Sequence, residues 1–227
     1  MSTIREIDCK CPFCKEKFTE TIQGSCSLFG LDMDSMPTGA AIVPNPIVRC
    51  PKCGFTEGNF SKEEGKSLKK YLKKNKFDPR EPCYYTLARE YEFVNKDDKL
   101  IADTYLNAFW ESIGNYAFLS IEEEGSRFFQ KLTIDKIDKI DSTDPEFMKY
   151  QLIKLDLVRR LGDFDWGLSL IYEFTNNLFH PCSDELKEFL KIEKELIKNK
   201  DTDSHALSKH LGVSLFGTSG EGIIFYG

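Results

Sequence analysis

Two pairs of cysteines constrain this chain more than any other feature, because each pair has the spacing of a metal-binding knuckle. The first is the Cys-Pro-Phe-Cys run at residues 11–14, and the second is the Cys-Pro-Lys-Cys-Gly run at residues 50–54. A structural zinc ion takes four soft or borderline ligands in a tetrahedron, and thiolates supply them. Two such pairs in one chain are typical of a four-cysteine site. The sequence therefore predicts one zinc ion with the ligands Cys11, Cys14, Cys50 and Cys53.

Three other interpretations of the cysteine pairs stay open. A Cys-x-x-Cys pair can be a dithiol–disulfide couple, although such couples are typically single and lie in a βαβ unit. Four thiolates also suit iron in a rubredoxin-like site. Cys9 lies two residues before Cys11 and could replace it as a ligand. In either metal interpretation four cysteines close the coordination shell, so we expect a structural rather than a catalytic ion.

Length and composition place the chain among globular proteins. Its 227 residues suffice for one large or two modest domains, and 18 phenylalanines help to supply a core. We find no signal-peptide pattern at the N-terminus and no run of about 18 apolar residues that would span a membrane. The remaining cysteines are scattered, which favours free thiols in a reducing cytoplasm. These remaining cysteines are Cys9, Cys26, Cys83 and Cys182.

Charge is distributed unevenly and indicates where the chain divides. Residues 61–80 carry a net charge of +5, residues 81–227 carry −10, and the first 60 residues are nearly neutral. We therefore predict four segments in chain order. They are a zinc-ribbon-like head at 1–60, a basic helical connector at 61–82, a helical body at 83–204 and a C-terminal tail at 205–227.

Between the cysteine pairs we expect a hairpin with an inserted loop, in which residues 47–49 form the strand that delivers Cys50. Beyond the head the pattern is helical. Ser61 followed by Glu64 is a capping-box signature for the connector helix. Apolar residues then recur at helical spacing. They predict helices over residues 83–95, 99–113, 117–139, 144–161 and 164–176, and from Ser183 onward.

The body has features of helical-hairpin repeats. Residues 157–168 resemble the middle of a tetratricopeptide repeat, with Gly167 at the small-residue position where two helices pack closely. Ala102 takes the same position in an earlier helix pair, 65 residues before, which is near twice the repeat length of about 34. The predicted fold class is α+β: a small zinc-ribbon-like head followed by a mostly all-α, tetratricopeptide-like body. A generic helical bundle is the alternative.

Head and body together resemble a bacterial family known as the domain of unknown function 2225 family. The resemblance rests on both cysteine pairs with Phe18 and Phe55 behind them, on the Asp-Met-Asp run at residues 32–34, and on Ala102 and Trp110 in the body. It covers most of the chain to about residue 200. The resemblance implies a zinc-ribbon head and tetratricopeptide-like helices, with no established activity.

Three classes of function follow from these features. A stack of helical hairpins favours an adaptor or scaffold with a protein or peptide partner. The basic segment beside a zinc ribbon favours nucleic-acid binding instead, although the aromatic residues that stack on single-stranded bases are not grouped with it in the sequence. An enzyme is the third class, and the sequence contains no nucleophile elbow, zinc-protease motif or phosphate-binding glycine loop. We therefore expect no catalytic residues and no membrane partner.

Overall fold

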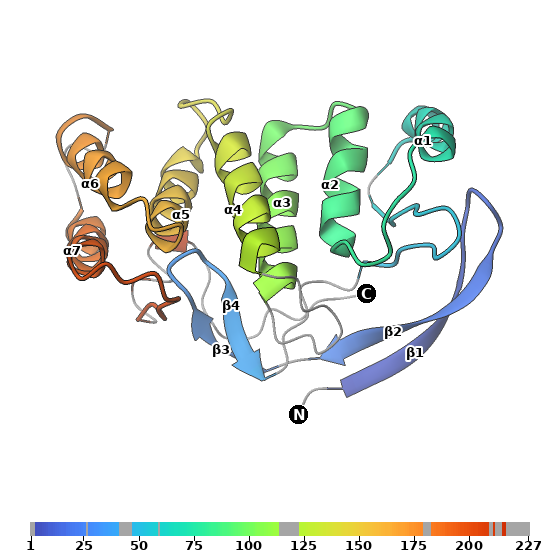
Figure 1. The fold of residues 1–227 in the computed structure, drawn as a ribbon, viewed down its shortest axis with the longest axis horizontal. Coiled ribbons are helices and arrows are strands. Elements are labelled where there is room, and N and C mark those ends of the chain that lie inside the picture. The colour runs from blue at the N-terminus through green and yellow to red at the C-terminus, as the bar shows by residue number, and fades with distance from the viewer. Residues whose placement is uncertain are drawn as a thin grey trace. The chain divides into compact units, whose positions relative to one another are not determined.

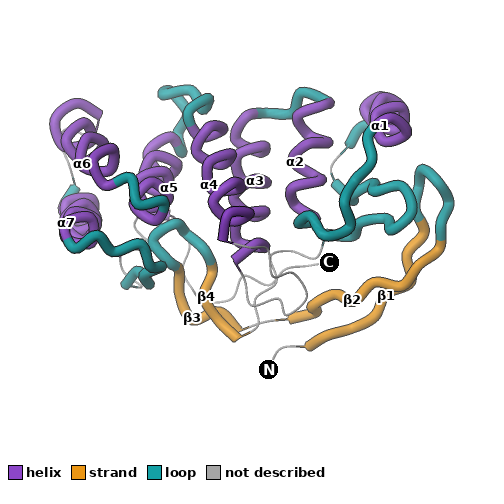
Figure 2. Tube along the Cα trace, in the orientation of Figure 1, coloured by secondary structure: helices purple, strands orange, loops and turns teal. Residues whose placement is uncertain are grey.

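The structure is a computed structural model of the chain (Figure 1). It describes residues 3–25, 27–40, 47–58, 60–113, 123–178 and 183–208, together with Leu211, Leu215 and Phe216. These residues form four β-strands, seven α-helices and one π-helical turn (Figure 2). None of the helices in this part of the chain is both long and apolar enough to cross a membrane.

The described residues fall into two compact units. Those of unit 1 lie within Met1–Ser25 and Val43–Lys136, and those of unit 2 lie within Cys26–Ile42 and Ile137–Ile224. This division cuts across the four segments predicted above, since residues of the predicted head occur in both units. Unit 1 holds strands β1 and β2 and helices α1 to α4, whereas unit 2 holds β3, β4 and the remaining helices.

Unit 1 begins with an antiparallel hairpin of β1 (Thr3–Lys10) and β2 (Lys17–Ser25). Its register pairs Cys9 with Phe18 and ends at Lys10 opposite Lys17. Residues 11–16 therefore form the hairpin loop, and this loop contains the first cysteine pair. This hairpin lies on either side of the first pair and was not predicted. The hairpin predicted between the two pairs is present as a second one, described below.

The strand predicted at residues 47–49 is wrong. Arg49 makes only a single antiparallel bridge with Thr56, and the Glu57 amide donates to the Val48 carbonyl at 2.8 Å. Pairing ends on the knuckle side because residues 51–54 form the turn, and the described residues show no further bridge on the side of residues 47 and 48. The strands that lie between the cysteine pairs in sequence are β3 (Ser27–Leu31) and β4 (Pro37–Ala40), an antiparallel hairpin of unit 2.

Helix α1 (Lys62–Lys74) begins with the predicted capping box. The Glu64 amide donates to the Ser61 hydroxyl at 3.2 Å, and the Ser61 amide donates to the Glu64 carboxylate at 2.6 Å. These bonds satisfy two amides that would otherwise lack partners at the helix start. Leu68 is fully buried on the inner face of the helix.

Helices α2 (Cys83–Phe93) and α3 (Asp98–Ile113) pack against each other as a pair, and α4 (Glu123–Ile137) follows along the chain (Figure 1). The turn between α2 and α3 is polar, and Asn95 adopts a φ of +54° there. Buried side chains of both helices form one cluster. Its members are Leu87, Ala88, Tyr91, Ile101 and Tyr105.

Unit 2 contains α5 (Phe147–Arg160), α6 (Phe164–Glu173) with its π-helical continuation η1 (Phe174–Leu178), and α7 (Asp184–Lys198). A Cβ atom on Gly167 would lie 2.8 Å from Ile197 Cδ1, so the missing side chain lets α6 approach α7 closely. The small-residue role predicted for Gly167 concerned the helices on either side of the turn at 162–165, and there the nearest atom of α5, Val158 Cγ1, would lie at an ordinary contact distance of 4.0 Å. The tetratricopeptide-like arrangement itself stays a prediction.

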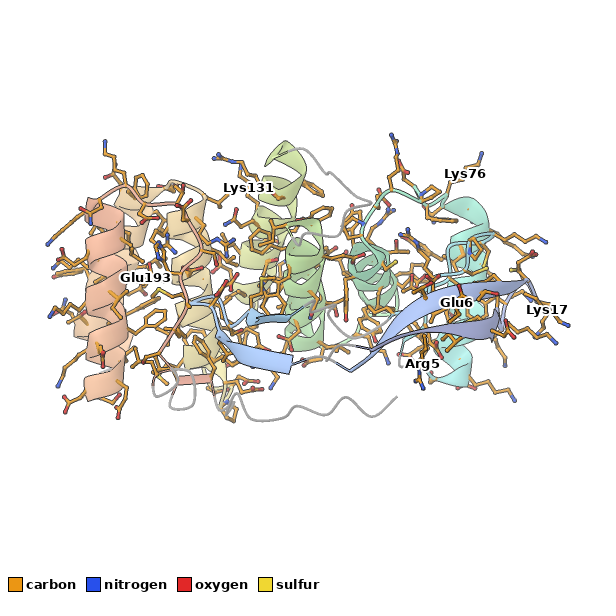
Figure 3. All side chains as sticks on the ribbon, turned by 90° about the horizontal axis from the view of Figure 1, so that it is seen from below. Arg5, Glu6, Lys17, Lys76, Lys131 and Glu193 are labelled. Atoms are coloured by element: carbon orange, nitrogen blue, oxygen red, sulfur yellow. The ribbon has the colours of Figure 1, made fainter. Side chains whose placement is uncertain are left out.

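A buried ion-pair network, which the sequence analysis did not predict, joins the helices of unit 2. Arg159 of α5 has no exposed surface, and its Nε lies 3.1 Å from Glu193 Oε2 of α7. Figure 3 shows Glu193 among the side chains between these helices. The Arg159 guanidinium also pairs with Asp156 one turn earlier. The carboxylates around Arg159 compensate for the burial of its charge. Glu193 Oε1 has no hydrogen-bond partner among the described residues, and burial raises the pKa of Glu193 to about 9.

The neighbouring Arg160 extends this network to the loop after β3. Its Nη1 lies 2.8 Å from Oδ2 of Asp34, which is fully buried. The second Asp34 oxygen accepts from the Met36 amide at 3.0 Å, so Asp34 also closes its own turn. Asp34 therefore pairs with an arginine and stabilises a turn, as aspartate residues commonly do in turns.

Several predictions differ in detail or lie outside the described residues. The helix predicted from Asp144 begins at Phe147, because the amides of Thr143 and Glu146 donate to Asp141 and Asp144 in preceding turns. The calls on other residues lie outside the described part of the chain. They concern Cys26, Cys182, residues 117–122 of the predicted third helix and residues 217–227 of the predicted tail.

Candidate metal centre

The two cysteine pairs have the same backbone geometry. In each, the amide of the first cysteine donates to the carbonyl five residues later, at 2.9 Å in the first pair and 2.8 Å in the second. The amide after the second cysteine donates back to the first cysteine's carbonyl at 3.0 Å in both. The residue that makes this return bond has a positive φ in each case, +66° at Lys15 and +76° at Gly54. The two turns are therefore equivalent knuckles.

These knuckles bring four sulfur atoms together. The Sγ atoms of the four predicted ligands all lie within 4.8 Å of one another. Cys11 Sγ lies 3.6 Å from Cys53 Sγ, and Cys14 Sγ lies 3.5 Å from Cys50 Sγ. A tetrahedron with Zn–S bonds of about 2.3 Å has sulfur–sulfur edges of about 3.8 Å, so the cluster has the dimensions that a four-thiolate ion requires.

The contacts also bear on the dithiol interpretation. All four cysteines are free, and each of the two short sulfur–sulfur contacts joins one knuckle to the other. A disulfide would need sulfur atoms about 2.05 Å apart. The arrangement is thus one shared cluster of four thiols rather than two separate Cys-x-x-Cys couples.

Backbone amides point at the sulfur atoms and complete the knuckles. The Glu16 amide donates to Cys14 Sγ, the Phe55 amide donates to Cys53 Sγ, and the amides of Lys52 and Cys53 donate to Cys50 Sγ. Such bonds stabilise the thiolate form. Burial acts in the opposite direction and raises the pKa of the Cys53 and Cys50 thiols. A bound dication would offset that penalty, because metal coordination deprotonates thiols.

Apolar side chains enclose the cluster from several elements. Cys11 and Cys50 are almost fully buried together with Phe55 and Leu68. Phe18 also packs there, so both aromatic residues that follow the knuckles cover the site. Leu68 comes from α1, which the sequence analysis treated as a connector between domains. The helix instead forms part of the shell around the cysteines.

Two charged residues that the sequence analysis did not single out hold the second knuckle in place. Arg49 donates to the carbonyls of Glu81 and Pro79 at 2.8 and 2.7 Å. Glu90 of α2 accepts from the Thr56 amide at 3.1 Å. The sequence could have pointed to Glu90 through its position in the apolar stripe of α2, and in the structure its side chain is fully buried. A charged residue in such a stripe indicates a structural or functional constraint.

Gly54 shows how closely this knuckle fits its surroundings. A Cβ atom at this position would lie 2.3 Å from Cδ1 of Phe77. The ring of Phe77 is in turn covered by the Arg49 guanidinium, 5.3 Å from its centroid. The glycine is therefore needed both for its positive φ and for the close approach of the ring.

Cys9 does not belong to the cluster. It lies in β1 and lines a cavity of about 430 Å³ beside the first knuckle. Burial raises the pKa of its thiol, and the carboxylates of Glu57, Glu20 and Asp8 add to this effect. A thiol surrounded by carboxylates resists ionisation and is a poor metal ligand. Among the described residues, the four cysteines are the only group of three or more candidate ligands close enough to share an ion.

Comparisons of the chain with models of protein families, with curated proteins and with solved structures find no match.

Proposed function

We propose that the protein is a non-catalytic binding protein whose folded core includes one structural zinc ion held by Cys11, Cys14, Cys50 and Cys53. The observation that supports this proposal is the cluster of four thiols within 4.8 Å. Four thiolates fill the tetrahedron around zinc and leave no position for a substrate. The resemblance to the domain of unknown function 2225 family implies the same kind of head.

A structural role also agrees with what surrounds the cluster. Helix α1 packs on it through Leu68, and α2 holds the second knuckle through Glu90 and Thr56. An ion at this position would tie the β1–β2 loop to both helices. Its binding free energy would then contribute directly to the stability of unit 1.

The proposed role is that of an adaptor with a protein or peptide partner. Support comes from paired helices in both units and from large apolar side chains on their surfaces. Phe128 of α4 and Tyr172 of α6 are both exposed, and aromatic residues are enriched at protein interfaces. A random-peptide display library selected on the full chain tests this role. We expect enriched peptides that bind Phe128→Ala or Tyr172→Ala more weakly, whereas failure to enrich any peptide would argue against an adaptor.

Nucleic-acid binding is a second candidate, favoured by the surface of α1. Seven lysines in and just after this helix are exposed, and none forms an ion pair within the described residues. Figure 3 shows Lys76, the last of them, projecting outward beyond α1. Lysines without counter-ions are available to neutralise phosphates. The seven are Lys62, Lys66, Lys69, Lys70, Lys73, Lys74 and Lys76.

Elemental analysis of purified variants tests the zinc site. We expect about one zinc per chain in the wild type and loss of the metal in Cys53→Ser. Cys9→Ser is the matched control, because Cys9 is a nearby thiol outside the cluster, and it should keep its zinc. Full retention of zinc by Cys53→Ser would contradict the ligand assignment. Iron in place of zinc would favour the rubredoxin-like alternative.

A further inference from the structure

Two aromatic rings from different helices are stacked beside the lysine-rich surface of α1. The ring of Tyr71 in α1 and that of Phe93 at the end of α2 have centroids 4.5 Å apart and planes inclined by 28°. Phe93 remains 42% exposed despite this contact. Stacking residues are not grouped with the basic segment in the sequence, but the fold brings together two rings that are far apart along the chain.

Cations lie around this ring pair. Lys74 is three residues after Tyr71 and so shares its side of α1. Arg89 is four residues before Phe93 and interacts electrostatically with the Tyr71 side chain. The carboxylate of Glu64 on the same helix already pairs with Lys96 at 2.9 Å. The surface therefore presents an exposed ring with positive charge beside it.

The packing of α1 determines which partners this surface fits. A basic amphipathic helix that binds membranes must insert its apolar face into the lipid. In α1 that face is occupied, because Leu68 is fully buried and Tyr71 and Leu72 pack against the cysteine cluster. What remains for a partner is a row of lysines over a helix of 13 residues, which is about 20 Å long.

We propose that this surface binds single-stranded nucleic acid, with a base stacking on the exposed ring of Phe93 beside Tyr71 and the lysines of α1 contacting phosphates. Proteins that bind single strands without sequence preference combine these two elements, a positively charged track and aromatic stacking platforms. The inference deepens the second candidate function and rests on the proposed metal site, because α1 packs against the cysteine cluster.

Fluorescence anisotropy with a labelled oligothymidylate of about 16 nucleotides, the upper end of known site sizes, tests the proposal. We expect the affinity for the oligothymidylate to fall as the salt concentration rises from about 50 to about 200 mM. We also expect this affinity to exceed that for a duplex of equal length. Phe93→Ala should weaken binding by at least about fivefold at every salt concentration, the loss of one stacked base. Lys70→Gln/Lys74→Gln should lower the slope of log affinity against log salt by about 1.4.

Matched controls come from unit 2. Leu168→Ala removes an apolar side chain of α6 that is about as exposed as Phe93, and Lys191→Gln/Lys194→Gln neutralises two exposed helical lysines. Both should leave affinity and slope unchanged. Binding that Phe93→Ala does not weaken, equal affinity for the duplex, or no binding at about 50 mM salt would overturn the proposal. So would binding confined to vesicles of phosphatidylcholine and phosphatidylserine, which would assign the lysines to a membrane surface.

Zinc content measured on each preparation separates this inference from the metal site. A wild type that holds zinc but fails to bind the oligonucleotide overturns the nucleic-acid inference alone. A wild type that lacks zinc overturns the metal site, whatever the oligonucleotide result. Phe93→Ala should keep its zinc, because Phe93 lies outside the cysteine cluster.

Discussion

Replacing Glu90 with glutamine should give a gain in stability that grows with pH. Glu90 is fully buried in α2, and its two carboxylate oxygens lie 3.1 and 3.4 Å from the Thr56 amide nitrogen that donates to them. Burial raises the pKa of Glu90 from its ordinary value of 4.5 to about 9, and the Thr56 amide and the charge of Arg49 offset this effect only in part.

The sign of the pH dependence follows from that raised pKa. The folded protein keeps a proton on Glu90 at pH values where the unfolded chain has released it. The stability linked to this proton is fully present below pH 4.5 and is lost as the pH rises toward 9. The loss is about 1.4 kcal/mol per pH unit, or about 3 kcal/mol between pH ~5 and pH ~7. Glutamine does not titrate, while its carbonyl still accepts from Thr56.

Urea unfolding at a series of pH values measures this difference. A Trp166→Phe background leaves Trp110 of α3, in the same unit as Glu90, as the only tryptophan reporter. The stability of Glu90→Gln relative to the background should rise by about 3 kcal/mol from pH ~5 to pH ~7. Glu188→Gln, a change at an exposed position of α7, should show no such rise. Parallel curves for Glu90→Gln and the background would refute the reasoning.

Three further substitutions test other parts of the structure by urea unfolding. Gly54→Ala should lower the free energy of unfolding of unit 1 by about 2–4 kcal/mol, because the new Cβ would overlap Phe77 and alanine would have to adopt a positive φ. A decrease of less than about 1 kcal/mol would contradict the close packing of Gly54 against Phe77. Arg159→Met should lower the free energy of unfolding by about 3–5 kcal/mol, because Asp156 loses its buried ion-pair partner. An unchanged free energy of unfolding would show that the ion-pair network does not stabilise the fold. Lys15→Gly should raise the free energy of unfolding of unit 1 by about 1 kcal/mol, because glycine adopts the positive φ at this position without strain. A decrease would show that the lysine side chain stabilises the knuckle by more than its backbone strain costs.

The cysteine cluster was predictable because its information is local. The spacing within each pair shapes a knuckle, and the residue after the second cysteine adopts a positive φ whether it is Lys15 or Gly54. The capping box at Ser61 is local for the same reason, since all its bonds lie within one helical turn. Most helices were also predictable, because the 3.6-residue period of their apolar residues depends only on neighbouring positions.

Features that depend on contacts between distant segments were not predictable in this way. The apolar face of α1 indicated a helix but not that Leu68 would pack against Cys11 and Cys50. Arg159 lies within the helix predicted over residues 144–161, and only the fold places it beside Glu193. The stacking of Tyr71 on Phe93 likewise requires α1 and α2 to be placed together.

X-ray absorption spectroscopy at the zinc edge of the purified chain tests the central claim most directly, because it reports the atoms bound to the metal. The account predicts about four sulfur neighbours at about 2.3 Å and no nitrogen or oxygen in the first shell. A mixed shell with nitrogen or oxygen ligands, or a chain that carries no zinc and has its cluster cysteines oxidised, would contradict it.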